Sequence, residues 1–239
     1  MKRYILLILC VIAAAGAATA QINFDRIKRD KPDLAKIKKE INDRTSPYYY
    51  PRLMEEFERN DTVMKLDKYR YLYLGYALQE DYNPYRVPAV SVDTELMFRE
   101  TRLTPEECKQ VVNDAQMSLK DNPFNLEQMA ILIQALKQTR NEELAKIWQY
   151  KYNYILMAIV STGTGLDEEN AWYVIEPQHE YMLLNAMGYM VTEHIFYSPY
   201  YELLKVADNS GREVDEYTFN IQLILQEYYR KFPEELEEP

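Results

Sequence analysis

Two histidines are the residues of this sequence best suited to acid–base chemistry or metal binding. His179 lies between Gln178 and Glu180, and His194 follows Glu193. A zinc site needs three or four ligands that converge at about 2 Å, and no recognised ligand spacing joins these residues. We therefore expect hydrogen-bonded or surface histidines, with no metal and no cofactor.

Recognised catalytic motifs are missing from the sequence. It has no Gly-x-Ser-x-Gly turn, no Walker loop and no Cys–His pairing. Acid pairs such as Glu55-Glu56 and Glu142-Glu143 fall at predicted helix starts or on exposed faces. Because neighbouring side chains on a helix diverge, these pairs are interpreted as solvated charges and partners of helix dipoles. No catalytic residue is predicted.

Residues 162–170 combine Gly163 and Gly165 with several acidic side chains. A phosphate-binding loop places glycines between a strand and a helix, whereas this segment follows a predicted helix and precedes a predicted strand. A calcium loop needs alternating oxygen ligands around a central glycine, and only part of that order is present. The favoured interpretation is an interdomain linker.

The stretch 66–86 contains six tyrosines. On a helix, its apolar residues form two stripes on roughly opposite sides, which predicts a central core helix packed on two sides. Asn83-Pro84 is expected to end this helix, because the residue before proline disfavours the α conformation. A buried tyrosine hydroxyl needs a hydrogen-bond partner, so the stretch also predicts buried polar contacts.

Three residues beside the predicted helix exit form a candidate binding surface: Tyr82, Tyr85 and Arg86. Tyrosine offers rigid amphipathic area and arginine a planar set of donors, and both are enriched at interaction hot spots. The alternative is that these side chains only pack the long connection 81–103 onto the helices.

Several phrases of the sequence carry a family resemblance: Tyr-Tyr-Pro-Arg, Tyr-Arg-Tyr-Leu-Tyr-Leu-Gly-Tyr, Gln-Glu-Asp-Tyr-Asn-Pro-Tyr-Arg and Asp-Asn-Pro-Phe-Asn. They span about residues 47–140, and a looser likeness continues to the C-terminus. The chain resembles a secreted bacterial family classed as a domain of unknown function (family 4919). That resemblance implies no activity. The Asp-Asn-Pro-Phe-Asn turn resembles the inter-repeat turn of tetratricopeptide proteins, but the Trp and Gly signature of that repeat is absent.

Helix signals are strongest in the middle of the chain. Thr104 and Glu107 form a predicted capping box, Asn125 with Gln128 begins a second helix, and Asn141 begins a third. Helices of this length joined by short turns lie antiparallel to their neighbours. Helical hairpins are therefore expected here.

The pattern changes after Gly165 to aromatic and β-branched runs that predict strands. The expected strands are 171–175, 189–197, 200–207 and 214–221, with short helices at 177–187 and 222–232. Helices followed by consecutive strands predict an α+β fold: N-terminal antiparallel, tetratricopeptide-like helical hairpins, then a small antiparallel sheet with short helices. The predicted domains are 21–162, helical hairpins, and 163–239, a small α+β subdomain packed on them.

Residues 1–20 are interpreted as a signal peptide, with Lys2 and Arg3 before an apolar run and a small-residue cleavage site before Gln21. A lipoprotein would use Cys10, but Leu9 stands where a small residue is expected, and the position is early. We expect an exported protein, periplasmic or extracellular, without a stable membrane anchor.

The formal net charge of −10 argues against nucleic acid and anionic membrane surfaces as partners. With cleavage, Cys108 is the one cysteine left, so no intramolecular disulfide is expected. The preferred function is a secreted, non-catalytic binding or assembly module with a Tyr-rich groove for an unknown protein or glycan partner. The alternative is an uncharacterised secreted enzyme, possibly carbohydrate-active, since carboxylates and aromatic rings suit sugars.

Overall fold

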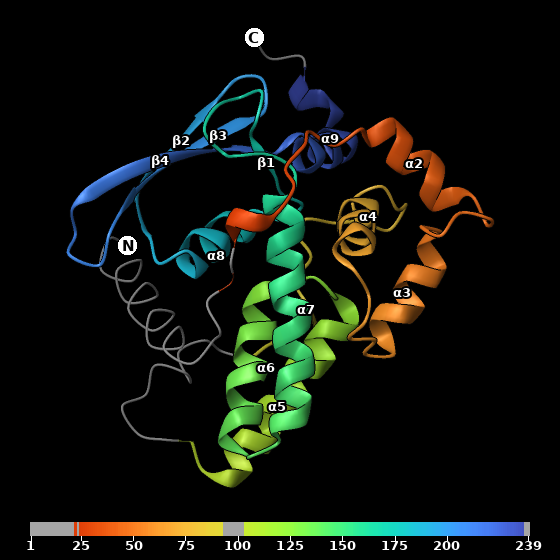
Figure 1. Cartoon of the computed structure of the whole chain (residues 1–239), viewed down its shortest axis with the longest axis vertical. Helices are drawn as coiled ribbons and strands as arrows, with labels where there is room; N and C mark the ends of the chain where they lie inside the picture. The colour runs from red at the N-terminus through yellow and green to blue at the C-terminus, as the bar shows by residue number, and fades with distance from the viewer. Residues whose placement is uncertain (1–21, 23, 93–102, 237–239) are drawn as a thin grey trace. The chain divides into compact units, whose positions relative to one another are not determined.

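The computed structural model describes residues 22, 24–92 and 103–236 (Figure 1). The predicted signal peptide, and residues 93–102 of the predicted long connection 81–103, lie outside this part of the chain. No helix among the described residues combines the length and apolar character that a membrane span requires. The described elements include both helices and a four-stranded sheet, which confirms the predicted α+β class.

The chain divides into two compact units. One comprises the described residues of 86–154 together with Ile22, and the other comprises the described residues of 24–85 and 155–236. This division differs from the predicted boundary between residues 162 and 163, because the N-terminal helices group with the sheet. One cause is Arg70, which donates hydrogen bonds to the Ser161 carbonyl at 2.6 Å and to Asp30 Oδ1 at 3.0 Å.

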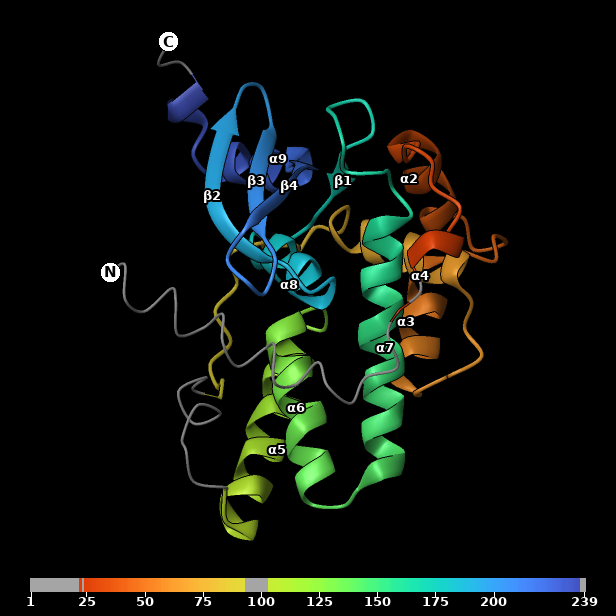
Figure 2. The ribbon, with the colours of Figure 1, turned by 60° about the vertical axis from the view of Figure 1, so that its left-hand side comes forward.

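The first unit contains the predicted helical hairpin. Helix α5 (Pro105–Asp121) begins with the Thr104–Glu107 capping box, and the Asn125 side chain caps α6 (Leu126–Gln138), as predicted. The two helices lie side by side in both ribbon views (Figures 1 and 2). Helix α7 (Glu142–Val160) follows, and the division between the units falls within it.

The second unit begins with the short helix η2 (Phe24–Arg26), followed by α2 (Leu34–Asn42), α3 (Tyr50–Glu58) and α4 (Leu66–Tyr76). Helix α4 packs against both α2 and α3. Its buried side chains fall on opposite sides of the helix and include Tyr69, Leu72, Tyr73 and Leu74. The prediction of a helix packed on two sides is confirmed.

Helix α4 ends at Tyr76, and the prediction that it continues to Asn83 is wrong. The N–H groups of Leu78 and Gln79 bond to carbonyls three residues back, so the chain tightens into turns after the last helical residue. The Tyr82 hydroxyl bonds to Ile175, a distant segment of the same unit. The periodicity of the local sequence does not predict a tertiary contact of this kind.

The sheet has the order β1-β4-β3-β2. Strands β2 (Met190–Tyr197), β3 (Tyr201–Ala207) and β4 (Glu213–Asn220) form an antiparallel meander, as predicted (Figure 2). Strand β1 (Trp172–Tyr173) instead pairs parallel to β4, so the sheet is mixed. Residue alternation shows that a segment is extended but not the direction of its neighbour, which is why this edge was not predicted.

Two helices accompany the sheet. Helix α8 (Gln178–Ala186) follows β1 and contacts β2, and α9 (Gln222–Lys231) follows β4 and leads to η4 (Pro233–Leu236). Phe196 is paired with Glu202, and His194 with Leu204. Residues directly opposite one another, and those two apart along a strand, share a face of the sheet. His194, Phe196 and Glu202 are therefore on one face.

Candidate functional site

Helix α8 holds two titratable side chains in the interior. His179 and Glu180 are adjacent on the helix, and both are 0% exposed. Successive residues of an α-helix point about 100° apart, so these side chains meet different surroundings. His179 contacts α4, and Glu180 faces strands β2 and β3.

His179 belongs to a buried hydrogen-bond network. Its Nδ1 lies 2.8 Å from the hydroxyl oxygen of Tyr73, which also accepts a hydrogen bond from the Ile175 N–H at 3.2 Å. The Tyr82 hydroxyl donates to the Ile175 carbonyl at 2.6 Å. Leaving a buried polar group unpaired costs about 1–3 kcal/mol, so these bonds hold α4 and the turns after it against residues 175–179. The network is structural, and it supplies the partners expected for buried tyrosines.

A second group, the carboxylate–histidine cluster, consists of Glu180, His194 and Glu202. His194 Nε2 is 3.2 Å from Glu202 Oε1 and 3.9 Å from Glu180 Oε2. Possible ligand atoms of the three side chains all lie within 4.8 Å of one another. Helix α8 supplies the first residue, while β2 and β3 supply the other two from the same face of the sheet.

The two carboxyl groups of the cluster differ in protonation. Burial, and then the negative charge of Glu202, raise the pKa of Glu180 well above its ordinary value. Burial also acts to raise the pKa of Glu202, but its hydrogen bonds with His194 and Glu180 outweigh that effect and lower it. Glu180 is thus the protonated partner. No donor in the described part of the chain bonds to either of its oxygens, so the contact with Glu202 rests on the proton that Glu180 carries.

Tyr181 fixes the orientation of the exposed histidine. Its hydroxyl oxygen lies 2.9 Å from His194 Nδ1, and the two rings meet edge to face. The other ring nitrogen, Nε2, is the one directed at Glu202 and Glu180. A hydrogen bond at one ring nitrogen sets the tautomer and direction of a histidine that ligates through the other.

Beside the cluster lies a cleft of about 310 Å³. Its walls are mostly apolar and come from the turns after α4, from β2 and β3, from α9, and from the residues that precede α8 and α9. The lining residues are Tyr85, Pro177, Phe196, Glu202, Ile221, Ile224, Leu225 and Tyr229. Tyr85 is 47% exposed and Phe196 is 53% exposed. Glu202 belongs to both the cleft and the cluster. Partial burial, and then the charge of Glu202, raise the pKa of the Tyr85 phenol.

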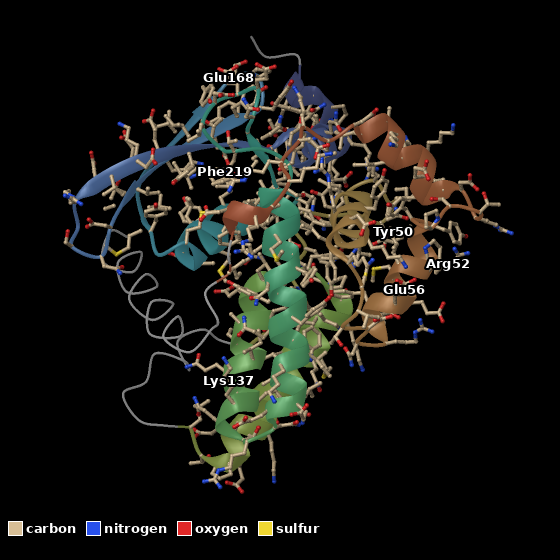
Figure 3. The ribbon with its side chains drawn as sticks, viewed as in Figure 1. Tyr50, Arg52, Glu56, Lys137, Glu168 and Phe219 are labelled. Atoms are coloured by element: carbon tan, nitrogen blue, oxygen red, sulfur yellow. The ribbon has the colours of Figure 1, made fainter. Side chains whose placement is uncertain are left out.

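A separate hollow of about 360 Å³ lies at the end of α3, where Figure 3 labels Glu56. Its lining is largely charged, and two of the charges pair with each other. Lys68 Nζ is 2.7 Å from both Glu56 carboxylate oxygens. Nothing in this lining selects a particular ligand, so no function is assigned to the hollow.

The three residues of the predicted binding surface have different positions. Tyr82 is 3% exposed and bonded to Ile175, so its side chain is part of the interior. Tyr85 lines the cleft. Arg86 belongs to the other compact unit, where its Nη1 lies 3.2 Å from Asp121 Oδ1. Of the three, Tyr85 alone contributes to the candidate site.

The glycine-containing segment 162–170 lies inside one compact unit and is not an interdomain linker. A Cβ at Gly163 would lie 2.1 Å from the Asn170 carbonyl oxygen, and the Gly163 carbonyl accepts a hydrogen bond from Trp172 Nε1 at 3.0 Å. Asp167 accepts a hydrogen bond from the Asn170 N–H at 2.8 Å. The glycines therefore allow a close approach of backbone and tryptophan.

Residues of the carboxylate–histidine cluster were not predicted as a site. Sequence spacing gives no reason to join Glu180 to Glu202, since their contact depends on how α8 packs on the sheet. The one available signal is the β2–β3 hairpin, which brings the strand containing His194 beside the strand containing Glu202.

Comparison with known proteins identifies a family. The model of the family described as "Domain of unknown function (DUF4919)" matches residues 35–230, which include the cleft and the cluster. No curated protein and no solved structure matches the chain. The match covers most of the sequence and agrees with the family resemblance of its tyrosine-rich phrases. The chain therefore belongs to the DUF4919 family.

Proposed function

We propose that this protein is an exported, non-catalytic binding module, and that the cleft beside Tyr85 receives its partner. The observation that carries the proposal is the open cleft itself, in which aromatic rings stand partly exposed at the wall. Burying a large apolar side chain contributes roughly 1.5–3 kcal/mol. Tyr85 and Phe196 each retain apolar surface that a partner can cover.

The lining favours a segment of a protein over a glycan. Sugar recognition relies on several convergent hydrogen-bonding groups, whereas this cleft offers one carboxylate and two phenols among aliphatic side chains. An apolar side chain of a partner matches these walls better. The formal net charge of −10 additionally favours a partner that is basic overall.

One observation favours an enzyme as the second candidate. Glu180 and Glu202 are a carboxyl pair with opposite protonation, which is the arrangement that glycosidases use as acid and base or nucleophile. A general acid must come within hydrogen-bond reach of its leaving group. Glu180 is 0% exposed and does not line the cleft, so the binding function is the better supported of the two.

The test is capture of partners from the exported fraction of the source cells. Immobilised protein is compared with the double variant Tyr85→Ala/Phe196→Ala and with Leu166→Ala, a control that removes an apolar side chain of 64% exposure outside the cleft. We expect a protein retained by the wild type and the control but lost from the double variant. Equal retention of the partner by the wild type, the control and the double variant contradicts the assignment of the cleft as the binding site. If the protein instead binds only to a glycan array, its partner is a sugar and not a protein.

A further inference from the structure

The strongest unexplained feature of the second unit is the Glu180 carboxyl group. It is 0% exposed, its pair of oxygens receives no hydrogen bond from any donor in the described chain, and one of them is directed at His194 Nε2 at 3.9 Å. Buried polar groups are normally paired. A buried carboxyl group that receives no hydrogen bond from a described donor and converges on a histidine and a second carboxylate needs an explanation.

The distances in the cluster are close to those of a ligand set. Ligands at about 2.0–2.1 Å from a tetrahedral zinc ion lie roughly 3.3 Å from one another. His194 Nε2 is 3.2 Å from Glu202 Oε1 and 3.9 Å from Glu180 Oε2. Small side-chain rotations therefore suffice to bring the three atoms around one ion.

We propose that Glu180, His194 and Glu202 form a binding site for a divalent metal ion of the zinc type. One imidazole and two carboxylates are donors that zinc accepts. The site differs from the sequence-based expectation of no metal, because its ligands come from a helix and two strands. It is independent of the proposed partner-binding function, although Glu202 also lines the cleft.

Two surrounding features support the assignment. The Tyr181 hydroxyl, 2.9 Å from His194 Nδ1, holds the ring with its other nitrogen toward the carboxylates, as outer partners of metal-bound histidines do. Three protein ligands also leave one position of a tetrahedral ion for water or for a donor atom of a bound molecule. His194 is partly exposed, so an ion has a route from solvent.

The test is isothermal titration of the purified protein, without a histidine tag, with ZnCl₂. We expect one ion per chain, and affinity lowered at least tenfold in Glu180→Gln and in His194→Gln. Tyr181→Phe should weaken zinc binding by about tenfold, the lower end of the range for outer partners. The control is Glu193→Gln, next to His194 on β2, whose carboxylate is paired with Lys205 at 2.6 Å.

Glu180→Gln is the decisive variant because it retains the shape of the side chain and replaces the proposed carboxylate ligand by an amide. Circular dichroism melting checks that each variant is folded. Unchanged zinc affinity in Glu180→Gln overturns the proposal, as does an equal loss in Glu193→Gln. Binding of Ca²⁺ or Mg²⁺ without Zn²⁺ overturns the zinc-type assignment. Failure of the wild-type protein to capture a partner, with zinc binding intact, counts only against the partner-binding function of the cleft.

Discussion

At the scale of single residues, position on a helix decides the role of two neighbouring side chains. His179 has a hydrogen-bonded place between α4 and residues 175–176, as expected of a histidine without a ligand motif. Glu180, next in the chain, faces the sheet with no donor in the described chain bonded to it. The sequence predicts a hydrogen-bonded histidine but not the different surroundings of these two side chains. Those surroundings depend on which element covers each side of α8.

The protonation of Glu180 predicts how stability changes with pH. Its pKa in the folded protein lies above the ordinary value of 4.5, so above pH 4.5 the folded state binds more protons than the unfolded state. The free energy of unfolding should therefore fall as pH rises through the folded pKa. Glu202 changes the free energy of unfolding in the opposite direction. Because its pKa is lowered in the folded protein, it contributes stability that is lost only as pH falls below 4.5.

Urea unfolding at a series of pH values, with chelator present, measures this effect. We expect Glu180→Gln to flatten the decline above pH 4.5, because glutamine has no proton to lose, and Glu193→Gln to follow the wild type. Parallel curves for the wild type and Glu180→Gln would show that Glu180 ionises normally in the folded protein.

At the scale of elements, much of the fold follows from local signals. The capping residues Thr104 and Asn125 start α5 and α6 as predicted, and aromatic and β-branched runs locate strands β2, β3 and β4. The end of α4 and the direction of β1 were wrong, since both depend on contacts with distant segments. Of the residues that line the candidate site, Tyr85 was predicted from the sequence, as a tyrosine of the candidate binding surface.

The turn before β1 gives a prediction for one element. In Gly163→Ala the new Cβ would meet the Asn170 carbonyl oxygen at 2.1 Å, which forces the backbone of the 162–170 segment to move. We expect a loss of about 2–4 kcal/mol, within the range of severe steric substitutions. Gly188→Ala is the control, because its new Cβ meets open space. Its loss of stability, about 1–2 kcal/mol, comes only from placing an alanine in the left-handed backbone conformation.

Thermal unfolding followed by circular dichroism compares the two glycine variants. Gly163→Ala should lower the Tm clearly more than Gly188→Ala. Equal shifts would mean that the segment yields easily and does not depend on close packing against Asn170.

At the scale of the whole molecule, chain order and compact units do not coincide. The sequence predicts one boundary near residue 162, whereas helices α2 to α4 group with the sheet, in the same unit as residues 155–236. Hydrogen bonds between Arg70 and Ser161 join residues that are far apart in the chain. Composition and periodicity describe each segment but not which distant segments meet, so the division could not be predicted.

Export remains a prediction about the whole chain. Cleavage after the small-residue site predicts a secreted form that begins at Gln21 and has no lipid anchor. N-terminal sequencing and the intact mass of the protein recovered from the exported fraction check it. A form that retains residues 1–20, or one acylated at Cys10, would contradict this interpretation.

The affinity of the captured partner for cleft variants tests the central claim most directly. Hot-spot side chains typically contribute 2 kcal/mol or more on truncation, and 1.4 kcal/mol is a tenfold change in Kd. We predict that Tyr85→Ala/Phe196→Ala raises the Kd at least tenfold without a change in fold, while Leu166→Ala leaves it unchanged. A partner that binds the folded double variant as tightly as the wild type would contradict the account.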